Sequence, residues 1–467
     1  MVLEKTHAST VAVYNSFTGD QIGTVPQSTK QDVSDALDLA KMGETIGRKM
    51  SASKRIAILK KAVTLMEREF NILSNLIATE GIKTIVQARK EVARAIHTMQ
   101  LSAEEAGRII GETIPFNAVP GSEDRFGYET KFPIGIVVAI TPFNDPLNLV
   151  CHKLGPAIAA GNPVILKPSD YTPLVAIKFG EILFESGLPK EMLSIITGSP
   201  ETFGDSLICD ERVRLISFTG GLEAAKVIQR KAGLKKIVME LGSNSPVIVL
   251  SDADLEEAVQ SCVSGAFFAS GQNCVGVKRI FIEEDIYDSF LTHFSQLTST
   301  LKIGSPLSED IDMGPIISKE SIHQIDSFIA ESRDHGVKLI CGGKTIGNCY
   351  TPTILEADCD NDITNCKEVF GPVVTLSKVK NLEQAIACCN KSPFGLHTAI
   401  FTKNINNAHK AINELECAGV MVNDSTDYRI DSMPFGGVKS SGMGREGVKS
   451  AIEAMSETKI VCFKLKI

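Results

Sequence analysis

Between residues 134 and 242 the chain alternates short apolar runs with longer amphipathic segments. The apolar runs, which are typical of strands buried on both faces, are residues 134–140, 163–167, 192–197, 215–219 and 237–242. The intervening segments that are typical of helices are residues 149–160, 173–186 and 222–232. Strands that alternate with helices form a parallel sheet with crossover connections, so the sequence predicts an α/β fold of the nucleotide-binding type.

Three of these strands end in residues suited to ligand binding, since ligands of such sheets bind beyond the carboxyl ends of the strands. The three ends are Thr-Pro-Phe-Asn at residues 141–144, Lys-Pro-Ser-Asp at 167–170 and Phe-Thr-Gly-Gly at 218–221. The Gly-x-Gly-x-x-Gly fingerprint is absent from the sequence. Gly220 and Gly221 either expose backbone amides to a pyrophosphate or only turn the chain. Lys167 and Asp170 either reach the hydroxyls of a ribose or form a solvated ion pair.

A second feature is the stretch 265–275, where small and apolar residues lead to Gly271 and then to Cys274. A helix expected at residues 252–268 would deliver this thiol at its end. A thiol is a strong nucleophile only as the thiolate, and its pKa falls when positive charge or helix N-terminal amides face it. From this stretch alone, Cys274 is either a nucleophile or one more buried cysteine.

Length and composition limit the classes of protein to which this chain can belong. A chain of 467 residues exceeds one ordinary core, so two or three domains are expected. The net charge of -8 argues against nucleic-acid binding, and no apolar run reaches the roughly 18 residues of a membrane span. The polar residues 1–10 lack the apolar core of a signal peptide. The 12 cysteines are scattered without a Cys-x-x-Cys pair, which favours free thiols in a reducing cytoplasm and no metal site.

The pattern predicts further elements around this core. Near the N-terminus we expect a hairpin at residues 11–25, one long helix at 54–77 ending before Gly81, and a second helix at 83–105. In the second half we expect helices at residues 287–301 and 321–335 and strands at 279–282, 373–376, around Phe401 and at 420–422. Glycines crowd residues 435–437 and 441–444, which indicates a functional loop. Residues 125–132 alternate like an exposed strand, and residues 459–467 like an edge strand that pairs with another subunit.

Eight short strings follow one another in a recognisable order. They are Asn144 after Thr-Pro-Phe, Lys167 in Leu-Lys-Pro-Ser, Phe-Thr-Gly at 218–220, Glu240 in Glu-Leu-Gly, Cys274 in Gly-Gln-x-Cys, Glu368 in Glu-x-Phe-Gly-Pro, Pro-Phe-Gly-Gly at 434–437 and Gly-Arg-Glu at 444–446. From Asn15 to the C-terminal strand, the chain resembles the NAD(P)-dependent aldehyde dehydrogenase superfamily, and in particular its lactaldehyde dehydrogenase-like members. Each string alone is weak, but eight in order leave little room for chance.

The resemblance implies a division of the chain into three parts. A Rossmann-type cofactor domain would comprise residues 1–113 and 133–240, and an α/β catalytic domain residues 241–430. A small β oligomerisation arm with a closing loop would comprise residues 114–132 and 431–467. Members with this organisation form homo-oligomers, so a dimer or tetramer, most simply a homotetramer, is expected.

The resemblance also implies roles for individual residues. Cys274 would attack the aldehyde, and the Asn144 side chain with the Cys274 backbone amide would bind the oxyanion. Glu240 would act as the general base that activates water against the thioester. The expected cofactor is NAD, with NADP as the alternative. The residues expected to bind it are Thr141, Pro142, Phe143, Lys167, Ser169, Asp170, Phe218, Thr219, Gly220, Gly221, Leu241, Gly242, Glu368 and Phe370.

The sequence departs from the family pattern at three cofactor positions. Ser243 replaces the second glycine of Glu-Leu-Gly-Gly, and Gly221 replaces the serine of Phe-Thr-Gly-Ser. Asp170 replaces a glutamate beside the adenosine ribose and is one methylene shorter. A carboxylate there still favours a free 2′-hydroxyl and therefore NAD. None of the three departures affects the nucleophile or the base.

The substrate is the least constrained part of the prediction. The segment at residues 422–433 is similar to that of members that oxidise small polar aldehydes, such as lactaldehyde or glycolaldehyde. A short anionic aldehyde is the alternative (a succinate-semialdehyde-, phospho- or sulfo-aldehyde-like compound), with Arg429 as its anchor. Asp431 could instead neutralise Arg429 in a structural ion pair. His152 and Asn273 are the other expected substrate contacts.

Two further interpretations come from other functional classes. A non-catalytic binding protein with this fold would show changes at Cys274, Asn144 or Glu240, and the sequence has none. An enzyme that passes the thioester to coenzyme A would typically lack the hydrolytic base, which is present as Glu240.

Overall fold

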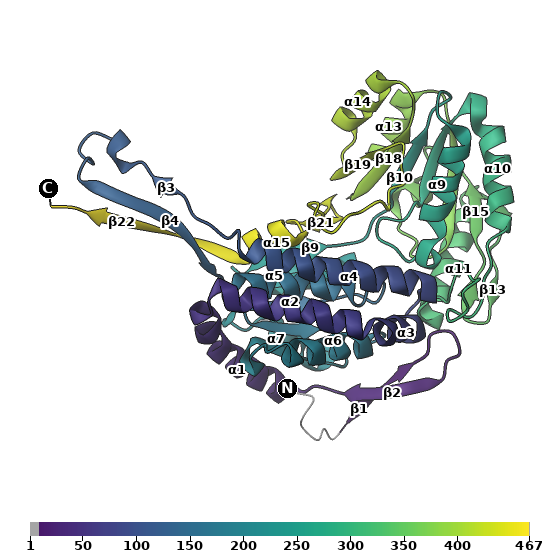
Figure 1. Cartoon of the computed structure of the whole chain (residues 1–467). Coiled ribbons are helices and arrows are strands. Elements are labelled where there is room, and N and C mark those ends of the chain that lie inside the picture. Colours follow the sequence, from purple (N-terminus) through teal and green to yellow (C-terminus); the bar gives the residue numbers. More distant parts are fainter. Residues whose placement is uncertain (1–8, 467) are drawn as a thin grey trace.

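The computed structural model describes residues 9–466. The prediction for residues 1–8 and the last residue of the expected C-terminal strand, Ile467, lie outside the described residues. Two α/β bodies lie beside each other, and a narrow β arm extends away from one of them (Figure 1). A hairpin of β1 (Thr10–Tyr14) and β2 (Gln21–Pro26) forms near the N-terminus, as predicted.

The first body contains a six-stranded sheet in the order β21-β9-β8-β5-β6-β7. Its strands are β5 (Ile136–Ile140), β6 (Val164–Lys167), β7 (Leu193–Ile195), β8 (Val213–Thr219), β9 (Lys236–Glu240) and β21 (Gly442–Met443). All except β21 run parallel, and the intervening helices are α5 (Asn148–Ala160), α6 (Pro173–Glu185), α7 (Pro200–Ile208) and α8 (Leu222–Lys231). The alternating strand and helix pattern in the sequence is thereby confirmed.

Successive side chains of β5 point alternately into two hydrophobic cores, one on each face of the sheet. Val137 and Ala139 belong to the core formed with α2 (Ala52–Arg68), α3 (Phe70–Glu80), α4 (Ile85–Ala106), α5 and α6. Ile136 and Val138 belong to the core formed with α1 (Lys30–Lys49), α7 and α8. Because successive strand side chains point to opposite faces, a strand covered on both sides reads as a continuous apolar run.

The prediction of one long helix over residues 54–77 is wrong. Glu69 leaves the helical conformation, with φ -92° and ψ 12°, and separates α2 from α3. Met66 and Phe70 keep a helical spacing of four residues across the break, and glutamate is a good helix former. The sequence therefore carries no visible signal for the interruption. Helix α1, which begins with a capping box between Thr29 and Asp32, was not predicted.

The second body contains a seven-stranded sheet in the order β12-β15-β16-β11-β10-β18-β19. Its strands are β10 (Pro246–Val249), β11 (Arg279–Glu283), β12 (Lys338–Cys341), β15 (Thr353–Glu356), β16 (Val373–Val379), β18 (His397–Phe401) and β19 (Gly419–Val422). One face packs against α9 (Leu255–Phe267) and α10 (Tyr287–Ser299), and the other against α13 (Leu382–Asn390) and α14 (Ile405–Glu414). Helix α11 (Lys319–Asp334) forms a separate cluster with β15 and the start of β16.

The arm is a three-stranded antiparallel sheet. It consists of β22 (Ser456–Lys464), β4 (Arg125–Pro133) and β3 (Thr113–Ile114), in the order β22-β4-β3. All nine residues of β22 pair with β4, and the other edge of β22 has no partner strand within the described residues. Figure 1 shows the arm projecting from the first body with the C-terminus at its tip. Phe126, Ile460 and Phe463 are exposed on it, which leaves an apolar surface and an open edge.

All twelve cysteines are free thiols. Cys359, Asp360 and Cys388 each place one potential ligand atom within 4.8 Å of the others, and the Lys391 ammonium lies 2.5 Å from the Asp360 carboxylate. None of the described helices has the length and apolar character that crossing a bilayer requires.

Candidate active site

Cys274 follows helix α9, as predicted, on a loop with an unusual backbone. Helix α9 ends at Phe267, and a 3₁₀ turn, η4 (Phe268–Gly271), comes next. Residues 269–271 adopt three consecutive left-handed conformations, with φ between 50° and 67°. For a residue other than glycine such a conformation costs roughly 1–3 kcal/mol, and strained backbone of this kind clusters at functional sites. The loop therefore leads to Cys274 through backbone conformations that are unfavourable in isolation, so the surrounding structure must stabilise them.

Two cavities meet at Cys274. The glycine-lined cavity, named for Gly220 and Gly221, has a volume of about 240 Å³. The arginine-lined cavity, named for Arg94 and Arg429, has a volume of about 460 Å³. The residues that line both are Leu149, Thr219, Glu240 and Cys274. A thiol and a carboxylate at this junction face two adjacent binding spaces.

The glycine-lined cavity brings together most of the residues predicted for the cofactor and the oxyanion. They are Pro142, Phe143, Asn144, Thr219, Gly220, Gly221, Leu241, Gly242, Glu368 and Phe370. Thr141 and Phe218 lie one residue away from lining residues. Helix α8 begins here with Gly221 as its N-cap, and no side chain caps its first amides. Uncapped amides at a helix N-terminus suit a phosphate, so this end of the cavity fits a dinucleotide pyrophosphate.

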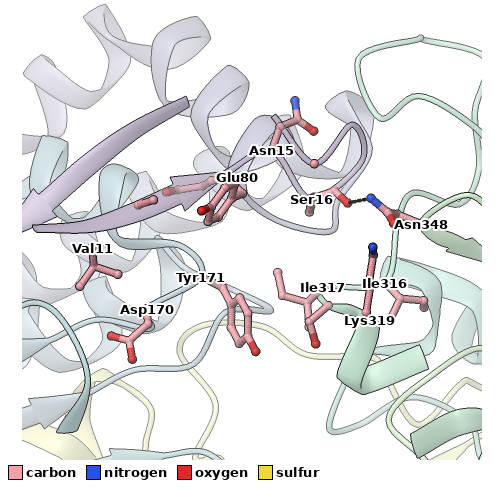
Figure 2. Close-up of a pocket in the computed structure, with 14 residues that line it drawn as sticks. Val11, Asn15, Ser16, Glu80, Asp170, Tyr171, Ile316, Ile317, Lys319 and Asn348 are labelled. Carbon is pink, nitrogen blue, oxygen red and sulfur yellow. Dashed lines mark hydrogen bonds between the residues drawn. The ribbon is translucent and has the colours of Figure 1, made fainter. Parts of the chain in front are cut away.

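Lys167 is the last residue of β6, Ser169 and Asp170 follow it, and all three lie outside the glycine-lined cavity. The Lys167 ammonium is 2.7 Å from the Asp170 carboxylate. Asp170 also borders a third cavity of about 550 Å³, where Figure 2 shows it beside Tyr171 and opposite residues 316–319. This larger cavity contains neither Cys274 nor Glu240, so size does not mark the reactive site.

Sequence comparison decides the family. Residues 3–461 match the profile of the Aldehyde dehydrogenase family. The chain belongs to the aldehyde dehydrogenase family. The resemblance inferred from the eight strings, the fold class and the expectation of an oxidoreductase are thereby confirmed.

Two curated proteins and one solved structure illustrate the relationship. The chain is 44% identical to aspartate-semialdehyde dehydrogenase 1 of Pseudomonas canavaninivorans, over 97% of each chain. It is 38% identical to a lactaldehyde dehydrogenase of Methanococcus aeolicus, over 98% of this chain and 97% of that one. The glyceraldehyde-3-phosphate dehydrogenase GapN of Methanocaldococcus jannaschii, solved with NADP, superposes with a TM-score of 0.93. It shares 39% identity over 97% of this chain and 99% of that one. This aldehyde dehydrogenase is thus an NAD(P)-dependent enzyme.

In this aldehyde dehydrogenase, the Glu240 carboxylate is buried and ends β9 beside both cavities. Neither of its oxygens has a hydrogen-bond partner among the described residues. Burial, and then the negative charge of Glu446, raise the pKa of Glu240 well above its ordinary value. A carboxylate without partners and with a raised pKa is able to accept a proton from water at this junction.

Glu446 belongs to the predicted Gly-Arg-Glu string and forms a buried ion pair. Its Oε1 atom lies 2.5 Å from the Lys153 ammonium, which also donates to the Ser217 hydroxyl at 2.9 Å. Although burial opposes it, the charge of Lys153 lowers the pKa of Glu446. Glu446 therefore stays ionised and keeps its influence on Glu240.

Cys274 is partly buried between the two cavities. Burial raises the pKa of its thiol to about 12, while the positive charge of Arg429 acts in the opposite direction. The helix that precedes Cys274 directs its C-terminus, not its N-terminus, toward this loop. Arg429 is therefore the main local source of positive charge that favours the thiolate.

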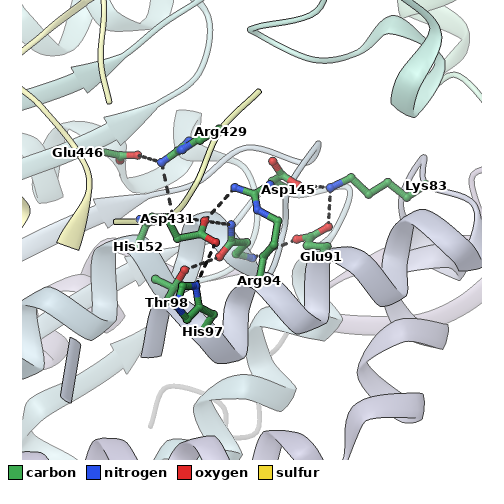
Figure 3. A network of polar contacts seen from close by, with 11 residues as sticks. Lys83, Glu91, Arg94, His97, Thr98, Asp145, His152, Arg429, Asp431 and Glu446 are labelled. Atoms are coloured by element: carbon green, nitrogen blue, oxygen red, sulfur yellow. Dashed lines mark hydrogen bonds and ion pairs between the residues drawn. The ribbon is translucent and has the colours of Figure 1, made fainter. Parts of the chain in front are cut away.

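Among the described residues, Glu446 is the one carboxylate within ion-pair distance of Arg429, and it does not reach hydrogen-bond distance (Figure 3). Its guanidinium stacks on the Phe435 ring, 3.7 Å from the centroid. Its Nη2 atom is 3.5 Å from His152 Nε2 and 4.0 Å from Glu446 Oε2. Its Nε atom is buried and has no hydrogen-bond partner among the described residues. The Arg429 side chain lines the arginine-lined cavity, while its unused Nε donor is shielded from solvent.

Asp431 contacts Arg94, Asn148 and His152 instead of Arg429. It accepts hydrogen bonds from Arg94 at 2.9 Å and from the Asn148 amide at 3.1 Å, and it lies 3.0 Å from His152 Nε2. Although burial opposes it, the hydrogen bond with His152 and the charge of Arg94 lower the pKa of Asp431. The ion pair between Arg429 and Asp431 that the sequence allowed does not form.

Sequence reasoning missed several residues of the arginine-lined cavity. Asn273 and Arg429 line it as expected, whereas His152 is fully buried behind Arg429 and is not part of the lining. The lining residues that were not predicted include Lys90, Arg94, Asp145, Phe268, Tyr428, Phe435 and Glu446. Lys90 and Arg94 belong to α4, which the sequence presents as an ordinary amphipathic helix. Phe435 and Glu446 carried a signal, because each lies in a recognised string.

Proposed function

We propose that this enzyme oxidises a short aldehyde to its carboxylic acid, with Cys274 as nucleophile and Glu240 as general base. The observation that carries the proposal is the position of both residues at the junction of the two cavities. One cavity has the free helix amides and glycines that suit a dinucleotide. The other is lined by charged side chains of both signs, among them Arg94 and Arg429, which suits a small polar substrate.

The steps follow from the groups at the junction. The Cys274 sulfur, after losing its proton, bonds to the aldehyde carbon, and the carbonyl oxygen becomes an oxyanion held by the Asn144 amide and the Cys274 backbone amide. Bound NAD(P) supplies the hydride acceptor, so that the carbon is oxidised to a thioester. Glu240 then takes a proton from a water molecule, whose oxygen attacks the thioester carbon. The carbon–sulfur bond breaks, and the acid leaves Cys274 free.

The residues of the glycine-lined cavity would hold the cofactor along its length. Amides of Gly221 and the first turn of α8 would bind the pyrophosphate. Glu368, whose Oε1 accepts from the Ser243 backbone at 2.9 Å, would hold the nicotinamide ribose. Asp170, held by Lys167, would accept from the 2′-hydroxyl of the adenosine ribose, which favours NAD over NADP.

An anionic aldehyde is the substrate class that we propose. Asp431 is engaged by Arg94 and His152, so it does not neutralise Arg429, whose side chain lines the cavity. A guanidinium of this kind suits a carboxylate, phosphate or sulfonate two or three atoms from the aldehyde carbon. The relatives that act on aspartate semialdehyde and glyceraldehyde 3-phosphate support an anionic group. A neutral lactaldehyde-like substrate is the second candidate, supported by the lactaldehyde dehydrogenase relative.

Assembly and compartment complete the proposal. We propose three functional parts, with residues 1–113 and 133–240 binding the cofactor, 241–430 carrying the nucleophile, and 114–132 with 431–467 forming the arm and closing loop. The open edge and apolar surface of the arm would pair with another copy in a homotetramer. Twelve free thiols suit a reducing cytoplasm.

A panel of neutral and anionic aldehydes, assayed with NAD and NADP, tests the proposal. We expect reduced cofactor to form with an anionic aldehyde and a free acid to be the product, with or without coenzyme A. Formation of an acyl-coenzyme A would contradict the hydrolytic role of Glu240. A higher kcat/KM for lactaldehyde than for every anionic aldehyde would select the second candidate.

A further inference from the structure

Lys278 is a buried cation that the proposed reaction does not use. It lies four residues after Cys274 and immediately before the central strand β11. Its side chain is buried, and its ammonium has no described carboxylate within 4.0 Å. Instead it donates to two backbone carbonyls, that of Gly271 at 2.5 Å and that of Gly371 at 3.0 Å.

These two carbonyls belong to the two loops that border the glycine-lined cavity. Gly271 ends the left-handed run 269–271 that leads to Cys274. Gly371 lies three residues after Glu368, whose carboxylate lines the cavity. The loops are already in close contact, because a Cβ atom on Gly271 would lie 2.2 Å from the Gly371 carbonyl oxygen. The Lys278 ammonium is therefore a bridge between the nucleophile loop and the Glu368 loop.

The base of this bridge is rigid. The backbone of Lys278 donates to Ser245 at 3.0 Å and accepts from Thr375 at 2.9 Å, so strands on both sides hold it. Burial lowers the pKa of Lys278 to about 8, although the charges of Glu368 and Cys274 favour the ammonium. Burying a cation is costly unless its hydrogen bonds are satisfied. An apolar side chain would avoid that cost, but it could not join the two carbonyls.

We propose that Lys278 is a positioning residue that ties the nucleophile loop, residues 269–274, to the Glu368 loop, residues 368–371. A cofactor that engages Glu368 then also fixes the position of Cys274. This inference rests on the proposed roles of Cys274 and Glu368. It predicts energetic coupling between occupation of the glycine-lined cavity and the state of the thiol.

The adjacent Arg279 provides a matched control. It is also buried, and its guanidinium donates to the Asn244 carbonyl at 3.0 Å and to the Asn365 side chain at 2.9 Å. None of these partners lines either cavity at Cys274. Removing this second buried cation tests the stability cost of such a change without touching the bridge.

The experiment measures the rate at which iodoacetamide alkylates Cys274, with and without NAD or NADP, with mass spectrometry to separate this site from the other cysteines. In the unmodified protein we expect the cofactor to change the rate by about 5-fold or more, the lower end of typical coupling between sites. In Lys278→Met we expect this cofactor effect to vanish, while the Kd for ADP-ribose, which lacks nicotinamide, stays unchanged. We expect kcat to fall by up to roughly 100-fold through misplacement of the thiol.

In Arg279→Met we expect a lower Tm but an intact cofactor effect on Cys274, and in Lys278→Arg a partial return of that effect. A full cofactor effect in Lys278→Met would overturn the proposal, as would no cofactor effect in the unmodified protein. If Lys278→Met does not fold, Lys278→Gln takes its place in the same measurement. Alkylation needs no turnover, so an enzyme that oxidises no aldehyde would overturn the proposed function alone.

Discussion

The glycine-lined and arginine-lined cavities share Cys274 and Glu240 but are built in different ways. The former is lined by three short runs of consecutive residues, 142–144, 219–221 and 240–242, together with Glu368 and Phe370. The latter is lined by side chains from α4, η4, the segment 424–429 and Glu446, and many of them are charged. The first cavity is thus made of strand ends, and the second of residues that only the fold brings together.

Three charges that line the second cavity, those of Asp145, Arg94 and Glu446, form ion pairs with residues outside the lining. Lys83 forms ion pairs with Glu91 and Asp145, Arg94 with Asp431, and Lys153 with Glu446. Figure 3 shows this network running from α4 to the C-terminal loop. Arg429 makes only a longer ion pair, with 4.0 Å between its Nη2 atom and Glu446 Oε2. From this difference we propose that the strand ends serve the common reaction, while Arg429 selects the substrate.

The largest expected effect tests the junction itself. Cys274→Ala removes the sulfur that we propose as the nucleophile, so we expect at least roughly a thousand-fold loss of aldehyde oxidation. Tm and cofactor Kd should stay close to those of the unmodified protein. Steady-state NAD(P)H formation checks the loss. Turnover above a few per cent would assign the nucleophile to another residue.

Glu240→Gln separates the two halves of the reaction. It keeps the size of the side chain but removes its basicity, so we expect turnover to fall by about 10²–10⁴-fold. Rapid mixing should show up to one reduced cofactor per active site, followed by a slow steady state as the acyl-enzyme accumulates. Equal loss of the burst and the steady state would place Glu240 in the activation of Cys274.

Arg429→Met tests whether the Arg429 guanidinium selects the substrate. Loss of a desolvated charge pair costs about 2–4 kcal/mol, so kcat/KM for an anionic aldehyde should fall by roughly 30- to 1,000-fold. The fall for a neutral aldehyde should be much smaller and should reflect only the loss of a charge that favours the thiolate. Arg94→Met is the matched comparison, because Asp431 already neutralises Arg94. Equal losses for both aldehydes would make Arg429 structural.

Substitutions of Glu446 and Lys153 test how these two charges shift the pKa of Glu240. Glu240 acts when ionised, so its raised pKa confines fast thioester hydrolysis to pH values above that pKa. Removing the negative charge in Glu446→Gln should lower the pKa of Glu240 and move the acid limb of hydrolysis to lower pH. Removing the positive charge in Lys153→Met should move it to higher pH. Single-turnover hydrolysis rates measured across pH check both signs, and shifts in the same direction would contradict the electrostatic origin.

The smallest effect concerns the adenosine end of the cofactor. The Asp170 carboxylate would accept from a 2′-hydroxyl and repel a 2′-phosphate, so kcat/KM should be higher with NAD than with NADP. Asp170→Ser should lower kcat/KM with NAD by about 10-fold, the value of one hydrogen bond to a charged group, and reduce the preference. An unmodified enzyme that uses NADP equally well would contradict this role of Asp170.

The sequence by itself determined the parallel sheet and the strings at its strand ends. Buried strands read as continuous apolar runs, and the residues that follow a strand necessarily lie at its carboxyl edge. Local order along the chain was therefore sufficient to bring Asn144, Gly220 and Glu240 to one edge. The break at Glu69 escaped notice because the helical spacing continues across it.

Only the tertiary structure decided which charges remain unpaired. Residues 94 and 431 are far apart in the sequence, and neither segment contains a pattern that predicts their ion pair. That pair leaves Arg429 without Asp431, and the fold alone places the Lys278 ammonium between the carbonyls of Gly271 and Gly371. Periodicity reports which face of an element is buried, whereas the partner of a buried charge depends on long-range packing.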